Sequence, residues 1–362
     1  MLVRSVALLS SLLLCSSHSS QEVAALLDEH SYSRRSLTVK EQLQAAQMEL
    51  DRLLTGEQLF LQRLQHEPEM ILFYTGFKDY NTLKAFYLAL QPTPKTIGNW
   101  SRALKINNSS NSKVDAGFCA QHLCLFDQLF LFLCSVRRGF LPIDMYTQFR
   151  VSEDVVQTTW ITWCHYLFFM LGPLPIWPSR QAVNELMPPF FRTTFPKTRV
   201  VLHMTEIRIQ LPACTENSSH HKGSTTLKSL IGIAPSGSVS FVSSLYTAAV
   251  SHKDAIRESG VLNLLEPGDQ VLTDESLEIK DLLDVSGVNL VSLTLSQPNR
   301  QSVQDDLTHT DSGLLKVHMR RAIGRLKECH IFDDVVPSAL SGSVDQLWTV
   351  CALLTNFQEP LI

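Results

Sequence analysis

The stretch "RVVLHMTEIRIQ", Arg199–Gln210, decides the fold of the C-terminal half of the chain. Its first part, Val200–Leu202, is apolar, and its last part, Ile207–Gln210, alternates apolar and polar residues. This period of two predicts a β-strand with one buried face. The centre of the strand, His203–Glu206, brings a histidine, a threonine and a glutamate together. That polar interruption is a candidate functional site.

The segments after this strand alternate between strand and helix patterns. "TLKSLIGIAP" and "SVSFVSSLYT", joined by a turn at Ser236 and Gly237, predict a β-hairpin. The later elements are a helix near "SHKDAIRESG", the strand "QVLTD", the helix "SLEIKDLLDVSG", the strand "VNLVSLTL" and, after a polar loop, the amphipathic helix "LLKVHMRRAIGRLKEC". An order of three strands, helix, strand, helix, strand, helix predicts an α/β sheet with mixed pairing.

The chain before this sheet has helical patterns. "LCLFDQLFLFLCSVRRG" predicts a buried helix whose basic end suits the helix dipole. Ser152 is a natural N-cap for the next helix, and a tight turn precedes it. Two helices joined so closely indicate either a helix-turn-helix or an ordinary helical hairpin. In the first case the outward positions are Glu153, Asp154, Gln157 and Thr158, whose two acids repel phosphates.

The N-terminal region leaves two questions open. "MLVRSVALLSSLLLCSSHSSQ" has the outline of a secretory signal, with a basic start and an apolar stretch. Farther on, Val39, Leu43, Ala46 and Leu50 follow a heptad spacing that fits either a packing helix or a short coiled coil for self-association. No apolar run elsewhere reaches the roughly 20 residues of a membrane-spanning helix.

The composition is that of a globular chain. With 362 residues and 44% hydrophobic residues, it can form about two domains with buried cores. Its formal net charge of -4 argues against a globally basic nucleic-acid coat, although a local basic face is compatible with it. The eight cysteines form no C-x-x-C pair, which favours buried reduced thiols over disulfides or zinc ligands.

Long motifs in the C-terminal half carry a family resemblance. They are "PLPIWPSR" with "MPPFFRTTFPKTRVVL", "TEIRIQ", "TTLKSLIGIAPSGSVSFVSSLYT", "LLEPGDQVLTD", "RRAIGRLKECHIFD" and "SGSVDQLWTVCALLTNFQ". Together they resemble the DDE superfamily endonucleases of Harbinger-type DNA transposons and the host proteins derived from them. The helical region from Leu123 to Leu171 is similar to the transposase helix-turn-helix that precedes this nuclease, and "FYTGFKDYNTLKAF" is similar to the segment before it.

The resemblance implies a domain organisation and a fold class. The residue patterns predict a signal-like or disordered leader at 1–36 and a helical segment at 37–105 that is either a packing helix or a short coiled coil. The resemblance adds a transposase-type helix-turn-helix at 118–172 and a DDE endonuclease-like domain at 198–357. The expected fold is α+β or α/β. It has a helical N-terminal region followed by an RNase H-like mixed sheet flanked by helices.

The resemblance also implies a catalytic site of two aspartates and one glutamate that bind Mg²⁺ or Mn²⁺ for phosphodiester cleavage and strand transfer. Of the three positions, the second is Asp274 at the end of "QVLTD". The first is occupied by His203 and the third by Arg320, immediately before "RAI". A cationic Arg320 disfavours metal binding by Coulomb repulsion. We therefore expect a catalytically inactive site in which Asp274 is at most a weak metal ligand.

Nearby residues do not restore the acids. Glu206, three residues from His203 on a strand, is expected on the opposite face, and Glu328 is two helical turns beyond Arg320. Histidine suits a softer metal such as Zn²⁺, but the only other ligand expected at this site is Asp274. The family's Ser-Asp-Lys after the hairpin is Ser251-His252-Lys253 in this chain.

The resemblance suggests DNA as a partner and the nucleus as the compartment, whereas the signal-like N-terminus points to the secretory pathway. Plausible nucleic-acid contacts are Lys222, Lys228, Arg321 and Arg325. The alternatives are a solvated loop around "HHK" and a solvated face of the last helix. Three functions remain open: an inactive transposase-derived protein that binds DNA or protein, an active metal-dependent nuclease, and a non-enzymatic interaction protein that uses its helical half.

Overall fold

The computed structural model describes residues 64–93, 95–98, 123–140, 144–145, 151–210, 224–274, 279–293 and 317–359, with single positions at 43, 61, 149 and 361. The chain divides into two compact units, Met1–Phe60 and Leu61–Ile362. Nearly all described residues belong to the second unit. The predicted leader at 1–36 and most of the predicted coiled coil lie outside the described residues.

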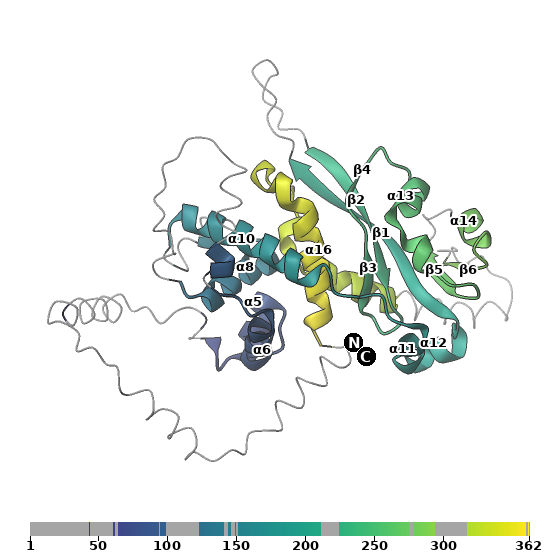
Figure 1. The fold of residues 1–362 in the computed structure, drawn as a ribbon, viewed down its shortest axis with the longest axis horizontal. Helices are drawn as coiled ribbons and strands as arrows, with labels where there is room; N and C mark the ends of the chain where they lie inside the picture. The colour runs from purple at the N-terminus through teal and green to yellow at the C-terminus, as the bar shows by residue number, and fades with distance from the viewer. Residues whose placement is uncertain are drawn as a thin grey trace, which may run out of the picture. The chain divides into compact units, whose positions relative to one another are not determined.

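The N-terminal part of the second unit is helical (Figure 1). Its long helices are α5 (Pro68–Thr75), α6 (Tyr80–Leu90), α8 (Leu125–Arg138) and α10 (Glu153–Leu171). Helix α8 is buried from Leu129 to Val136, as its apolar sequence predicts, and ends at Gly139 in the left-handed conformation that glycine adopts without strain. Ser152 is the N-cap residue of α10, as expected, but its side chain makes no capping hydrogen bond.

Helix α10 packs against other helices and makes side-chain hydrogen bonds to neighbouring segments. It packs on α8 and on α16 (Val344–Leu354), and Trp163 is fully buried at its centre. The indole Nε1 of Trp163 donates to Gln128 Oε1 at 3.3 Å, and His165 Nε2 lies 3.0 Å from Ser343 Oγ. The helix is therefore an integral part of the core of this unit.

The C-terminal part is built on a six-stranded sheet of order β3-β2-β1-β5-β6, in which β4 pairs with β2. The strands are β1 (Thr198–Gln210), β2 (Ser224–Ile233), β3 (Val239–Val242), β4 (Tyr246–Thr247), β5 (Gln270–Asp274) and β6 (Asn289–Leu293). Strands β1, β2 and β3 are antiparallel, whereas β1, β5 and β6 are parallel. The predicted turn between β2 and β3 is present, with Gly237 at a φ of 88°.

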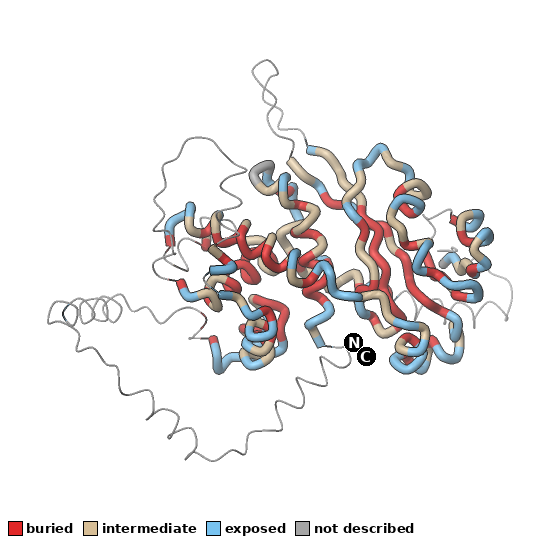
Figure 2. The backbone as a smooth tube through the Cα atoms, viewed as in Figure 1, coloured by how far each residue is buried: buried red, intermediate tan, exposed pale blue. Residues whose placement is uncertain are grey.

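The two faces of the sheet carry separate hydrophobic cores. One face packs on α11 (Arg180–Glu185), α12 (Pro189–Thr194), the helix at 317–327 and α16. The other face packs on α13 (His252–Ser259), η2 (Val261–Leu264) and α14 (Lys280–Asp284). Figure 2 shows the buried residues concentrated along the central strands and in helices α8 and α10. Because β1 is covered on both faces, its first five residues are all buried.

This architecture confirms the predicted fold class. A helical region precedes a mixed sheet with helices on both faces, and the strand order and directions are those of the RNase H-like fold. Within the described part of the chain, no helix is both long enough and apolar enough to span a bilayer. The five described cysteines have free thiols, and all but Cys124 are buried.

Candidate active site

The candidate site lies where the parallel strands β1 and β5 end their pairing. The last paired positions are Leu202 and Thr273, and the next residues of the two strands are His203 and Asp274. Asp274 is the last residue of β5. In open α/β sheets, ligands bind at the carboxyl ends of parallel strands. Asp274 stands at such an end, whereas β1 continues beyond His203 to Gln210 in antiparallel pairing with β2.

His203 is half-buried in the middle of β1 and is opposite Ile231 of β2. By the two-residue period of the strand, it shares a face with Val201 and Ile207. Both belong to the core that also contains Met319 and Ala322 of the helix at 317–327. The face of β1 that carries His203 is thus the face covered by the helix at 317–327, which contains the "RRAIGRLK" motif.

Arg320 is exposed on that helix, between the buried Met319 and the exposed Arg321. The acids that could replace the missing carboxylates are placed elsewhere. Glu206 is exposed and is opposite Lys228 of β2, on the face of β1 that carries Met204. Glu328 accepts from Arg137 of α8, with Nη2 and Oε2 2.5 Å apart. Glu328 is therefore engaged in a bridge between two helices.

The predicted nucleic-acid contacts are not on one surface. Lys228 is half-buried on the sheet face that packs on α13, whereas Arg321 and Arg325 are on a helix that covers the opposite face. Burial lowers the pKa of the Arg325 guanidinium, and Glu328 opposes this shift. Lys222 lies outside the described residues. The geometry thus does not unite Lys228 with the two arginines in a single basic face.

The N-terminal turn of α10 is acidic. Glu153, Asp154 and Gln157 are exposed, as expected for the outward positions of a recognition helix, and Thr158 is half-exposed. The Gln157 side-chain amide donates to Glu153 Oε1 at 3.4 Å. Backbone phosphates contribute most of the affinity of proteins for DNA, and this turn offers them two negative charges. Whether the helix pair acts as a DNA-binding helix-turn-helix stays a prediction.

The residues at the candidate site fit a divalent metal poorly. Mg²⁺ and Mn²⁺ prefer oxygen ligands, but the three expected acid positions hold one aspartate, one histidine and one arginine. A guanidinium has no lone pair to offer a cation. Among the described side chains, no three His, Cys, Asp or Glu residues are grouped so that they could hold a metal ion. No catalytic step through a metal is derived from this donor set.

The amino-terminal ends of the same strands hold a buried charge cluster that the sequence did not suggest. Arg199 and Asp269 are only 3% and 5% exposed, and Arg199 Nε lies 3.6 Å from Asp269 Oδ2. Arg180 Nη1 lies 3.3 Å from the other carboxylate oxygen. The Arg199 guanidinium also stands over the ring of Trp177, 5.2 Å from its centroid. The only sequence signal was an arginine at the start of an apolar strand.

Comparison with known proteins agrees with this architecture. Residues 202–356 match the family described as "DDE superfamily endonuclease". The C-terminal half of the chain therefore carries a DDE superfamily endonuclease domain. The matched range begins within β1 and ends within η5 (Thr355–Phe357). It contains most of β1, the other five strands and two of the helices on the His203 face, the helix at 317–327 and α16, whereas α11 and α12 precede it.

A chain of the structure titled "Mos1 transposase paired-end complex with left transposon end" also matches. It is 12% identical to this chain, and the match covers 72% of this chain and 87% of that one, with a TM-score of 0.21. At that score the similarity carries no argument about the site. No curated protein sequence matches the chain.

Proposed function

We propose that residues 198–357 are a transposase-derived, DDE endonuclease-like domain that no longer cleaves DNA and that acts by binding DNA or protein. The observation that supports this proposal is the parallel pairing of β1 with β5, whose last pair, Leu202 with Thr273, directly precedes His203 and Asp274. By resemblance to the family, the position of His203 belongs to the first catalytic aspartate.

Electrostatics supports the loss of activity. Two-metal cleavage needs several carboxylates because they offset the mutual repulsion of two cations. A histidine at position 203 contributes no negative charge, and Arg320 adds a positive one.

A cleavage assay on the full-length protein tests the proposal. We expect no cleavage of supercoiled or linear duplex DNA with either Mg²⁺ or Mn²⁺, measured by gel electrophoresis over several hours. Asp274→Ala is the matched variant, because it removes the one acid of the family triad that the sequence retains. Metal-dependent cleavage by the wild type that is lost in this variant would refute the proposal and establish an active nuclease.

A second candidate is a protein-interaction role for the helical half. It is favoured by the exposed acids Glu153 and Asp154 at the end of α10 that a transposase would direct to DNA. DNA-binding assays at several salt concentrations separate the two. A DNA-binding protein loses affinity steeply as salt rises, whereas an interaction protein shows no such DNA affinity.

Compartment and assembly are also proposals. The family resemblance supports a nuclear location, and the signal-like start of the chain supports the secretory pathway. Imaging of the protein tagged at its C-terminus distinguishes the two, because a cleaved signal would not remove the tag. Self-association through the predicted helix at 37–105 predicts a dimer by light scattering that is lost when Leu43 and Leu50 are changed to Asp.

A further inference from the structure

A cavity of about 230 Å³ opens where the end of α8, the first half of α10 and the chain from His330 to Leu340 meet. We call it the helix-junction pocket. None of its lining residues belongs to the candidate active site at the ends of β1 and β5. The volume is below the roughly 300–1,000 Å³ of most ligand pockets, so a ligand of about one ring would fill it.

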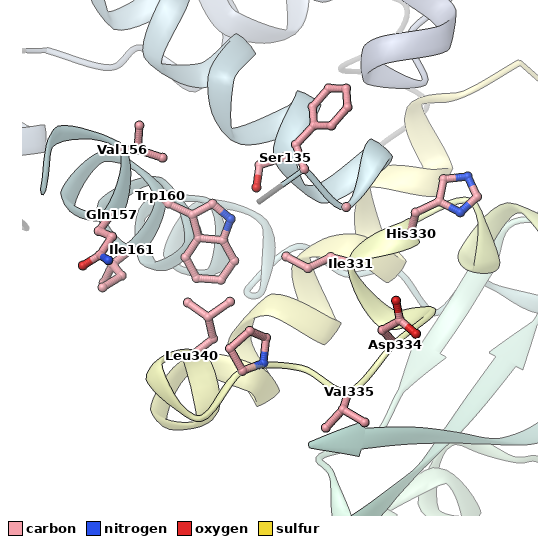
Figure 3. Close-up of a pocket in the computed structure, with 13 residues that line it drawn as sticks. Ser135, Val156, Gln157, Trp160, Ile161, His330, Ile331, Asp334, Val335 and Leu340 are labelled. Atoms are coloured by element: carbon pink, nitrogen blue, oxygen red, sulfur yellow. The ribbon is translucent and has the colours of Figure 1, made fainter. Parts of the chain in front are cut away.

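The walls of the pocket are apolar. In Figure 3 the side chains of Trp160 from α10, Ile331 from η3 (His330–Phe332) and Leu340 from η4 (Ser338–Ser343) converge on one space. Trp160 also packs against Phe132 of α8, with ring centroids 5.8 Å apart. The core thus fixes the indole in place. A fixed indole beside two aliphatic side chains is a surface on which a flat apolar group can stack.

One charged side chain in the lining is not engaged. Asp334 is exposed and, among the described residues, has no hydrogen-bond or ion-pair partner. Its neighbour Asp333 is engaged differently, because Asp333 Oδ2 lies 2.7 Å from His330 Nδ1. Arg208 Nη2 donates to the backbone carbonyl of Asp333 at 3.2 Å and is thereby engaged.

The opposite rim adds to the negative charge. Gln157 lines the pocket on α10, and its amide donates to Glu153. Glu153 and Asp154 are exposed one turn earlier on the same helix. A pocket with an indole wall, an unpaired carboxylate and an acidic rim is complementary to a cation with an apolar body.

We propose that the helix-junction pocket binds a small aromatic amine, with its ring against Trp160, Ile331 and Leu340 and its ammonium group at Asp334. The ring contributes burial of apolar surface, and the ammonium contributes a partly exposed ion pair. Such a pair is worth about a fivefold preference over a neutral group. The affinity of so small a ligand is on the order of micromolar to millimolar.

Three probes that differ in one group test the proposal on the full-length protein: 2-phenylethylamine, 2-phenylethanol and phenylacetate. Their dissociation constants are measured by calorimetry and by ligand-observed NMR. The amine is expected to bind about fivefold more tightly than the alcohol, and the carboxylate more weakly than both. Equal affinities for all three, or no binding of any of them, overturn the proposal.

Two neighbouring carboxylates provide the matched variants. Asp334→Asn is expected to make the amine bind no better than the alcohol, while the alcohol keeps its affinity. Asp333→Asn is the control and keeps the amine preference, because Asp333 is engaged by His330 and does not line the pocket. An amine preference that persists in Asp334→Asn, or that disappears equally in Asp333→Asn, contradicts the assignment.

A wall variant locates the ring. Ile331 is half-buried, so Ile331→Ala is compatible with folding, and it is expected to weaken all three probes by the same factor. Unchanged affinities in this variant would show that the probes bind somewhere other than the helix-junction pocket. Circular dichroism of each variant confirms that the helices are intact.

Discussion

Polar residues stand at both ends of the parallel pairing between β1 and β5, and they differ in burial and in their partners. At the amino-terminal end, Arg199 and Asp269 are almost fully buried and form an ion pair that Arg180 extends. Beyond the last parallel pair, Leu202 with Thr273, β1 continues with the half-buried His203 and β5 ends with Asp274. These are two of the positions where the family resemblance implies acids. The comparison teaches that the buried ion pair and the positions where the family resemblance implies acids are separate residues of the same two strands, so a substitution at one need not disturb the other.

The largest expected effect is a loss of unfolding free energy when the buried ion pair at the start of β1 and β5 is broken. Asp269→Ala leaves the Arg199 guanidinium buried without its partner and removes the acceptor for the Glu266 amide, which is 3.0 Å from Asp269 Oδ2. Removing one partner of a buried pair costs about 3–5 kcal/mol of unfolding free energy. Urea denaturation followed by circular dichroism measures this loss.

The control for this variant is an exposed pair. Lys78 and Glu359 are 63% and 58% exposed, and Lys78→Ala is expected to cost less than about 1 kcal/mol. If Asp269→Ala cost no more than Lys78→Ala, the buried cluster would not be the stabilising end of these strands.

The next largest effect is expected on metal affinity at the positions where the family resemblance implies acids. His203→Asp combined with Arg320→Glu restores the acids that the family resemblance implies, and we expect Mn²⁺ affinity to rise by roughly tenfold or more. Isothermal calorimetry measures it. His203→Asp with Arg321→Glu is the matched control, because Arg321 is also exposed and the net charge change is the same. An equal gain in both variants would mean that position 320 is not the third acid position.

The smallest effect concerns an exposed pair between helices α13 and α14. The Lys253 ammonium holds the pKa of the Asp281 carboxyl below its usual range, chiefly through a side-chain hydrogen bond. Because the folded-state pKa is lowered, this stabilisation is present above the unfolded pKa and is lost as the pH falls through the folded pKa. Lys253→Ala should return the Asp281 pKa to its ordinary value, with no measurable change in melting temperature. An NMR titration of the carboxyl carbon checks this, and an unchanged pKa would contradict the assigned cause.

Most of the fold follows from patterns along the chain. The two-residue period of "RVVLHMTEIRIQ" predicts the strand observed at Thr198–Gln210, and the succession of later elements predicts a mixed sheet. The short helices α11 and α12 carry no comparable signal, because six residues are too few for a helical period to stand out. Their place is fixed by the packing of Val183 and Phe191 on the sheet.

The candidate site is predictable only in part. The resemblance gives the positions of His203, Asp274 and Arg320, but not which of the nearby charges are already engaged. Glu328 is bound by Arg137 of a helix that precedes the sheet, and Glu206 lies on the opposite face of β1 from His203. The helix-junction pocket could not be predicted from the sequence, because its walls come from three segments with no shared motif.

The sequence by itself determined the periods of the strands and helices, the hydrophobic faces and the residue types at the three acid positions, since these depend on neighbours along the chain. The tertiary structure decided the register that pairs Leu202 with Thr273, just before His203 and Asp274, as well as the burial of Arg199 with Asp269 and the faces on which the basic residues lie. The physical reason is that register and ion pairing join residues far apart in the sequence, and only the packing of both sheet faces selects among the alternatives.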